Sequence, residues 1–165
     1  MPASSPLHKF LQWEKEIPND VFLRQPFHGH WKSWTWAEAG SEIRRMATAI
    51  KELNIEEGSH IAILSKNCAH WIMSDLAIMM AGCISIPIYP TLSDHAIQPI
   101  LEHSDAVAIF IGKLDDYSTQ VNGIPEGMIR ISFDDYGIKE QYQWNELIQK
   151  HTPAQNSYNW KPEDL

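Results

Sequence analysis

The turn Tyr89-Pro90-Thr91, which leaves a short apolar strand, is the first stretch whose residues could contact a ligand. In open α/β folds, ligands collect at the loops that follow the carboxyl ends of parallel strands. A simpler interpretation is a tight strand-to-helix turn, in which Pro90 restricts the backbone and Ser93 caps the next helix. That interpretation is the more common one for such a loop, so the turn alone assigns no function.

Acidic and histidine pairs are the next candidates for chemistry. Asp115-Asp116 and Asp134-Asp135 follow predicted strands and could bind Mg²⁺, which prefers carboxylate oxygens. No phosphate-binding loop accompanies them, so solvated turns are the better interpretation. His28-Gly29-His30 could form a metal pair, but no carboxylate or third imidazole stands at ligand spacing, and a polar turn is favoured. We therefore predict no metal site.

Two arginines and one histidine complete the set. Arg44 and Arg45 could bind an anion, but arginines in the middle of a helix beside glutamates indicate a solvated face. His70 lies in an otherwise apolar helix and is interpreted as a satisfied histidine at the edge of the core rather than a base. The sequence contains no G-x-x-x-x-G-K-[ST], G-x-G-x-x-G, G-x-S-x-G or C-x-x-C motif. We predict no catalytic residue.

The elements that position these residues centre on Gly58 to Leu92. This stretch predicts a strand, a buried helix and a second strand, at residues 60–64, 68–81 and 84–88. Asn67 is expected to cap the helix and Gly82 to end it in a left-handed conformation. The result is one βαβ unit, which should be right-handed.

The flanking sequence predicts further elements. Thr35-Trp36-Ala37-Glu38 is a capping box that opens a helix ending at Asn54. Before it, residues 7–13 suggest a short helix, residues 21–23 a strand, and the alternating Trp31, Trp34 and Trp36 a hairpin or an irregular loop. After the βαβ unit we expect helices at 93–104, 114–121 and 143–150 and strands at 106–111 and 128–133. Pro99 should kink the first of these helices or delay its start.

The predicted fold class is α/β, with three layers: a mostly parallel sheet with helices on both faces. The organisation expected is an N-terminal arm at 1–34, a parallel α/β domain at 35–150 and a linker at 151–165.

The chain has 165 residues and a formal net charge of −8 without a basic patch, which argues against nucleic acid or a membrane surface as partner. No apolar run reaches transmembrane length, and Met1 to Phe10 lacks a signal peptide's apolar region. Cys68 and Cys83 lie in apolar elements, as expected in a reducing compartment, so a cytoplasmic location is predicted.

Several segments are similar to sequence motifs of one known family and occur in the same order. Thr35-Trp36-Ala37-Glu38 has the form T-[YW]-x-E, Gly58 to Ile63 is similar to G-D-x-V-A-I, and Ile86 to Ser93 is similar to V-P-L-Y-P-T-L-S. Further matches are Arg45, Ala47, Ala49, Leu53, Asn67, Trp71, Ala77, Ala81-Gly82-Cys83, Ile100-Leu101 and Ser104-Asp105-Ala106. In this order they resemble the adenylate-forming acyl-CoA synthetases, the AMP-binding superfamily, and Phe22 to Trp31 looks like the long-chain fatty-acid branch. Ser59 replaces the family's Asp and Pro99 interrupts a helix; neither departure should affect the fold.

The resemblance implies an enzyme that uses ATP, Mg²⁺ and CoA and acts on a fatty acid. In such enzymes a Ser/Thr/Gly-rich phosphate-binding loop follows soon after a segment like Lys161-Pro162-Glu163-Asp164-Leu165, where this sequence ends. The ATP, adenylate and magnesium sites lie beyond that point in the family. Cofactor binding is therefore carried over only to Tyr89, Pro90 and Thr91, because the equivalent loop lies near the entering CoA nucleotide.

Three hypotheses remain. The first is an N-terminal fragment of a long-chain fatty-acid CoA ligase, inactive in isolation and prone to self-association through exposed apolar surface, with peripheral membrane contact only for the whole enzyme. The second is a standalone, non-catalytic α/β interaction or regulatory module. The third, a small nucleotide or flavin binder, is weakened because no glycine-rich turn follows the first strand at Leu64-Ser65-Lys66-Asn67. The coding sequence beyond codon 165 would separate the first two.

Overall fold

Five parallel strands form the central sheet of the computed structural model, which describes residues 5–160. The strands of this sheet are β3 (His60–Leu64), β4 (Ile84–Ile88), β5 (Ala106–Ile111), β6 (Ile129–Ser132) and β7 (Tyr142–Gln143). Their order across the sheet is β4-β3-β5-β6-β7. A separate antiparallel hairpin consists of β1 (Val21–Phe27) and β2 (His30–Thr35).

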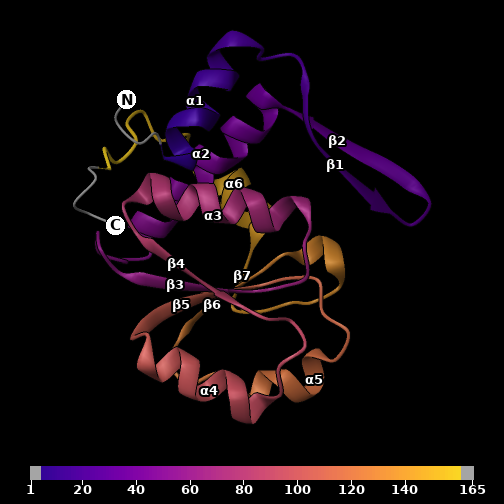
Figure 1. Cartoon of the computed structure of the whole chain (residues 1–165), viewed down its shortest axis with the longest axis vertical. Helices are drawn as coiled ribbons and strands as arrows, with labels where there is room; N and C mark the ends of the chain where they lie inside the picture. The colour runs from indigo at the N-terminus through magenta and orange to yellow at the C-terminus, as the bar shows by residue number, and fades with distance from the viewer. Residues whose placement is uncertain (1–4, 161–165) are drawn as a thin grey trace.

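Helices cover both faces of the sheet (Figure 1). The helices are α1 (Pro6–Glu16), α2 (Trp36–Glu52), α3 (Ala69–Ala81), α4 (Asp94–His103), α5 (Tyr117–Gln120) and α6 (Trp144–Lys150). The first three and α6 lie on one face, and α4 and α5 lie on the other. Short 3₁₀ turns, η1 (Val121–Gly123) and η2 (Asp134–Tyr136), follow α5 and β6. The predicted three-layer α/β class is confirmed.

The connections explain why the core has two parts. The chain passes from β3 over one face through α3 to β4, then crosses back past β3 over the other face through α4 to β5. The second crossover runs in the opposite direction across the sheet and over the opposite face from the first. The two crossovers therefore have the same handedness, as expected for connections between parallel strands. The larger core lies beneath α2 and α3 and the smaller beneath α4, and β3 and β5 contribute to both because their side chains alternate between faces.

The predicted helix ends around α2 and α3 are confirmed, with one exception. Thr35 accepts a hydrogen bond from the Glu38 backbone, and the Glu38 carboxylate accepts one from Thr35, so the capping box forms. Gly82 ends α3 at φ +83°, and a β-carbon there would lie 2.7 Å from the Tyr158 ring. Only glycine satisfies both conditions at this position.

The exception is Asn67, whose predicted capping of α3 is wrong. The helix begins at Ala69, with Cys68 in the capping position and no hydrogen bond from its side chain. Instead, Gln25 of β1 accepts a hydrogen bond from the Ala69 backbone at 3.2 Å. Gln25 is buried, so the hairpin supplies from outside the helix the acceptor that a local cap usually provides.

Other sequence expectations needed correction. Pro99 does not delay the start of α4, which begins at Asp94 and runs on to His103, and the alternative of a kink stays a prediction. The helix predicted at 114–121 shortens to the single turn α5, followed by η1. Arg44 and Arg45 do not form a solvated face: Arg44 makes two 2.6 Å hydrogen bonds to Glu14, and Arg45 donates to the carbonyls of Ile148 and His151.

Residues 151–160, predicted as linker, lie against the helices in the structure. The backbone of Ala154 donates to Arg44, the backbone of Tyr158 donates to Met80, and the Trp160 indole donates to the Met79 carbonyl at 2.8 Å. The segment 161–165, used in the family resemblance, lies outside the described residues. The domain boundaries at 34 and 150 stay predictions.

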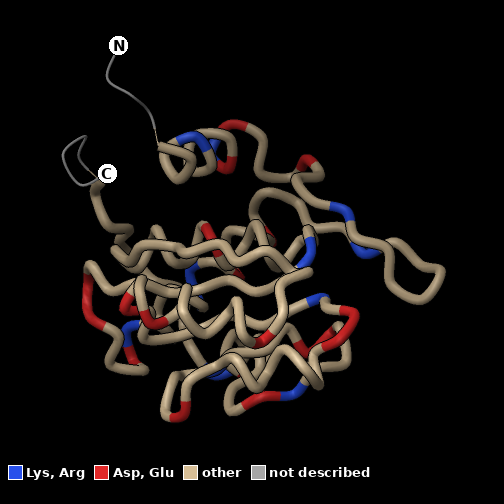
Figure 2. Tube along the Cα trace, turned by 60° about the horizontal axis from the view of Figure 1, so that its bottom comes forward, with Lys and Arg blue, Asp and Glu red and all other residues tan. Residues whose placement is uncertain are grey.

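Charge and helix length complete the description. Figure 2 shows lysines and arginines dispersed along the trace among more numerous acidic residues. Over the described part of the chain, none of the helices has both the length and the apolar character needed to cross a bilayer.

Candidate functional site

The loops that follow the parallel strands meet at the carboxyl edge of the sheet. Backbone hydrogen bonds join them: Lys66 donates to Lys113, Gly112 to Leu64 and Phe133 to Ile111, at 2.8–3.0 Å. Ser65, buried at this edge, also accepts from the Lys113 backbone. The edge is therefore a connected platform, as expected where ligands bind in open parallel sheets.

The loop that carries Tyr89, Pro90 and Thr91 lies at one end of this platform. Tyr89 is 78% exposed, the largest exposed fraction among the large hydrophobic side chains described. A hollow of about 350 Å³ separates this loop from the loop after β3; its lining residues are Ser65, Asn67, Trp71, Pro87, Ile88, Tyr89 and Pro90. The structure thus brings Tyr89 and Pro90 to the hollow, whereas Thr91 is not among its lining residues.

A second hollow adjoins the first. It has a volume of about 420 Å³ and is lined by Leu23, Arg24, Gln25, Asn67, Cys68, Ala69, Trp71 and Ile72. Because Asn67 and Trp71 line both hollows, an open depression runs from β1, past the first turn of α3, to the Tyr89 loop. Asn67 therefore contributes to this depression instead of capping the helix. No sequence motif indicates the part played by Arg24 and Gln25, which belong to β1.

The inner side of the Tyr89 loop rests on Gln120, which the sequence analysis did not identify. The Gln120 amide group donates to the carbonyl oxygens of Pro90 and Leu92, both at 2.9 Å. The side chain is 5% exposed. A glutamine in a weakly predicted helix carries no signal for such a contact, which joins residues about 30 positions apart in the sequence.

His70 is buried among aromatic side chains and does not face the depression. Its ring lies 5.3–5.7 Å, between centroids, from the rings of Trp34, Phe133, Tyr136 and Trp144. Burial lowers the pKa of His70 to about 4, against the attraction of Asp135. The neutral imidazole is a core side chain, which agrees with the interpretation from sequence, although it is more deeply buried than the core edge.

The acidic pairs have structural partners. Asp115 pairs with Lys66, and Asp116 accepts from the Thr119 backbone at the start of α5. Asp134 accepts two hydrogen bonds from Asn145, and Asp135 accepts from Asn145 and Lys32. Despite the opposing effect of burial, these bonds lower the pKa of Asp135. Among the described residues, no three His, Cys, Asp or Glu side chains could together hold a metal ion.

The histidine pair lies at the tip of the β1–β2 hairpin. His28 and Gly29 both have positive φ, +45° and +86°, between the paired residues Phe27 and His30. Two consecutive residues in this conformation form the turn that matches the twist of a hairpin. The hairpin interpretation of the tryptophan pattern is confirmed by this arrangement.

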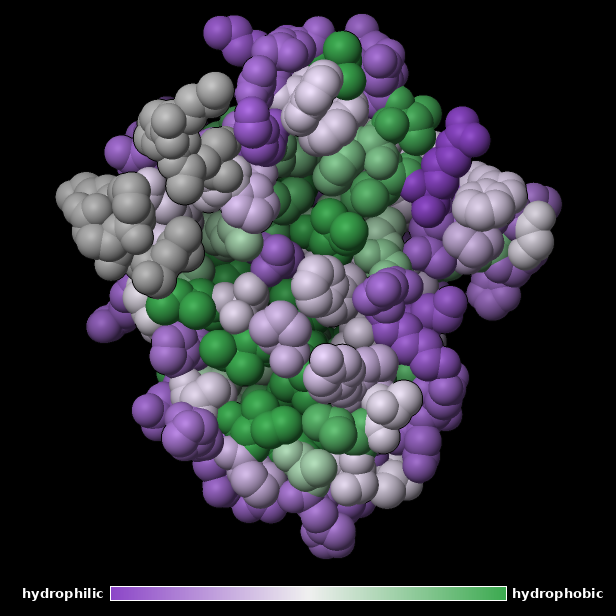
Figure 3. All heavy atoms as spheres, viewed as in Figure 1, coloured by the Kyte–Doolittle hydropathy of each residue, from purple (hydrophilic) through white to green (hydrophobic). Residues whose placement is uncertain are grey.

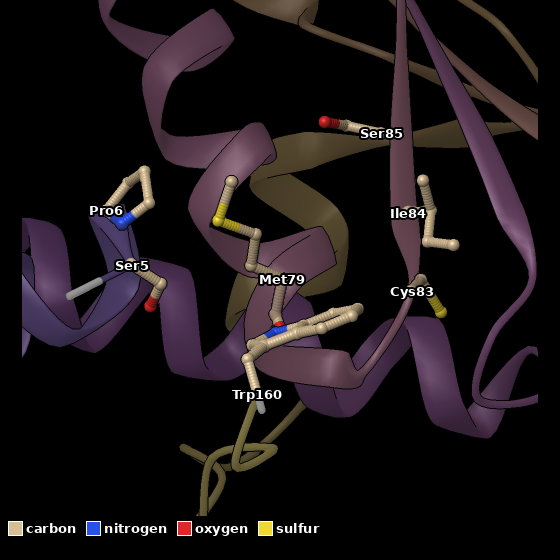
Figure 4. Close-up of a pocket in the computed structure, with 7 residues that line it drawn as sticks. All are labelled: Ser5, Pro6, Met79, Cys83, Ile84, Ser85 and Trp160. Carbon is tan, nitrogen blue, oxygen red and sulfur yellow. The ribbon is translucent and has the colours of Figure 1, made fainter. Parts of the chain in front are cut away.

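A third, apolar hollow of about 330 Å³ lies away from the platform, beside the amino end of β4. Figure 4 shows Met79 and Trp160 beside Cys83 and Ile84, with Ser5 and Pro6 of the N-terminal segment opposite. Cys83 is buried, and desolvation raises the pKa of its thiol to about 11. Since the thiolate is the reactive form, Cys83 acts here as a small apolar side chain.

A parallel sheet covered by helices on both faces places the structure in the α/β fold class. The chain belongs to the AMP-binding enzyme family, whose pattern matches residues 10–165.

Curated relatives place it near the acyl-CoA ligases. Over 111 residues, the chain is 32% identical to the long-chain-fatty-acid–CoA ligase FadD15 of Mycobacterium bovis, a match that covers 67% of this chain and 18% of that protein. It is 29% identical over 112 residues to long chain acyl-CoA synthetase 2 of Arabidopsis thaliana, covering 65% of this chain and 17% of the relative. The chain thus spans less than a fifth of the length of these relatives.

Solved structures share the fold. An anthranilate CoA ligase, AuaEII, in complex with anthranoyl-AMP superposes with a TM-score of 0.80 at 17% identity, covering 99% of this chain and 32% of that one. A benzoate CoA ligase from Burkholderia xenovorans LB400 gives 0.75 at 16% identity, with 94% and 30% covered. These likenesses confirm the predicted fold of an adenylate-forming ligase's N-terminal region.

Proposed function

We propose that this chain forms the N-terminal part of a long-chain fatty-acid CoA ligase and is inactive by itself. The complete enzyme uses ATP and Mg²⁺ to convert a fatty acid to an acyl-adenylate, releasing pyrophosphate. It then transfers the acyl group to the CoA thiol, releasing AMP. The observation that carries this proposal is the 32% identity over 111 residues to a long-chain ligase of which the match covers 18%.

Within such an enzyme, this segment supplies a scaffold and one wall of the ligand site. The Tyr89-Pro90-Thr91 loop contacts the nucleotide part of CoA. Three features support this role: the loop follows a parallel strand, it borders an open hollow, and the Tyr89 ring is 78% exposed. An exposed aromatic ring can stack on a nucleotide base, an interaction that stabilises binding by about 1–3 kcal/mol per base.

The proposed inactivity can be tested directly. The purified chain is incubated with palmitate, ATP, Mg²⁺ and CoA, and pyrophosphate release is followed with a coupled assay. We expect no release above a blank without protein, whereas the complete FadD15 ligase, assayed in parallel, should release pyrophosphate in a palmitate-dependent way. Palmitate-dependent release by the 165-residue chain alone would refute the proposed inactivity.

A further inference from the structure

The Tyr89 loop is attached to the rest of the structure from its inner side. Gln120 donates one hydrogen bond to the Pro90 carbonyl and one to the Leu92 carbonyl, both at 2.9 Å. A third bond, from the Leu92 backbone to the Tyr89 carbonyl at 3.2 Å, closes the loop upon itself. The outer side of the loop carries the exposed Tyr89 ring.

The chemistry of this contact requires a donor. Two carbonyl oxygens converge on one point, and each can only accept a hydrogen bond. The amide nitrogen of Gln120 has two hydrogens and matches both. The amide oxygen is buried and has no partner among the described residues. An amide in the opposite orientation would face oxygen with oxygen, so the contacts fix which way the side chain points.

The element that carries Gln120 is itself held firmly. Gly123, three residues later, packs so closely on the first turn of α4 that a β-carbon would lie 2.4 Å from the Asp94 carbonyl oxygen. Ile124 is buried in the smaller core with Ile97 and Leu101. The donor therefore projects from a segment anchored on both the core and the helix that follows the loop.

We infer that Gln120 is the positioning residue that fixes the Tyr89-Pro90-Thr91 loop in the conformation that presents Tyr89 to its ligand. This inference rests on the proposed CoA contact of the loop. Gln120 itself is buried beneath the loop and acts through it. Without the amide donor, the Pro90 and Leu92 carbonyls lose their shared hydrogen-bond partner and the loop gains alternative conformations.

The first test measures the loop in the 165-residue chain. Gln120→Met keeps the length and approximate volume of the side chain but removes the donor. Ile124→Val is the matched control, because it weakens the same core without touching the loop carbonyls. By NMR-detected hydrogen exchange, we expect the Leu92 amide to exchange roughly fivefold faster or more in Gln120→Met, the factor that ordinary hydrogen bonds provide. Amides of β5 should match those of the control.

Two results would overturn the inference at this stage. One is Leu92 exchange in Gln120→Met no faster than in Ile124→Val. The other needs no variant: in the unsubstituted chain, the Gln120 side-chain NH₂ group must exchange slowly with solvent. Free exchange of that group would contradict the contact even if Gln120→Met failed to fold.

The second test measures the ligand. In a complete ligase that carries this segment, Gln120→Met should raise the KM for CoA several-fold, while the KM for ATP and the rate of adenylate formation stay unchanged. Faster Leu92 exchange with an unchanged KM for CoA would overturn the positioning role. It would mean that Gln120 holds the loop but that the proposed contact between the loop and CoA is wrong. Unchanged exchange of the Leu92 amide would instead mean that Gln120 does not hold the loop, and it would not contradict the proposed function.

Discussion

At the scale of single residues, the structure uses polar side chains mainly to join elements. Glu42 accepts hydrogen bonds from the indoles of Trp34 and Trp144, at 2.9 and 3.0 Å, and so links the hairpin to α6. Both indoles are buried, and an unpaired buried donor is costly. His70 lies beside the same tryptophans, where it is almost fully desolvated.

His70 should make stability depend on pH. Its pKa is about 4 in the folded chain, against an ordinary value of 6.5, because burial disfavours the charged imidazolium. Between these two values the unfolded chain binds more protons, so stability rises with pH across the window and is lost as pH falls through it. The change amounts to at most about 3 kcal/mol.

We predict that His70→Phe flattens the pH dependence of the free energy of unfolding between pH 4 and 6.5. Phenylalanine fits an aromatic site and does not titrate. The measurement is urea denaturation at several pH values, with His95→Gln as a control, since it replaces an exposed histidine. An equally steep dependence in His70→Phe would show that other groups cause it.

At the scale of elements, α4 contains a proline that removes one of its backbone hydrogen bonds. Pro99 lies inside the helix and is exposed, yet the helix continues through it. Proline has no backbone N–H, so the carbonyl of His95, four residues earlier, loses its helical partner. The packing of Ile97 and Leu101 in the smaller core compensates for this loss.

Pro99→Ala should therefore stabilise the chain by about 1–3 kcal/mol, because it restores the hydrogen bond and the helix propensity at an exposed position. Thermal or urea denaturation measures the change. Pro87→Ala is the useful comparison, since Pro87 lies in the edge strand β4, where a proline costs no hydrogen bond if its nitrogen faces outward. Destabilisation of Pro99→Ala would mean that the native helix depends on the ring.

Most elements could be predicted from sequence because their signals are local. The capping box at Thr35, the apolar run at His60–Leu64 and the glycine at position 82 each act within a few residues. The failures involve partners distant in sequence. Gln25 replaces Asn67 at the start of α3, Arg45 binds the end of α6, and Gln120 supports the Tyr89 loop. A periodic pattern of apolar residues does not indicate contacts between residues so far apart in the sequence. The sequence analysis therefore did not identify Gln120, which supports the Tyr89 loop from its inner side.

At the scale of the whole molecule, apolar side chains lie on the face that carries α3 and β4. Ile84, the first residue of the edge strand β4, is 37% exposed. Figure 3 shows hydrophobic residues gathered across this view of the molecule. Edge strands with exposed apolar side chains favour association.

We predict that the chain self-associates through this face. Sedimentation velocity should show a weight-average mass that rises with concentration, and Ile84→Lys should reduce it. Val107→Lys is the matched control, because Val107 is a similarly exposed apolar residue at the start of a different strand, β5. A monodisperse monomer at all concentrations, or an equal effect of both substitutions, would contradict the prediction.

The coding sequence downstream of Leu165 is the measurement that best tests whether this chain is the N-terminal part of a fatty-acid CoA ligase. We expect an open reading frame that soon encodes a Ser/Thr/Gly-rich loop ending in lysine, followed by the rest of a ligase. A stop codon immediately after position 165 would contradict it and would favour a natural short α/β protein with a non-catalytic role.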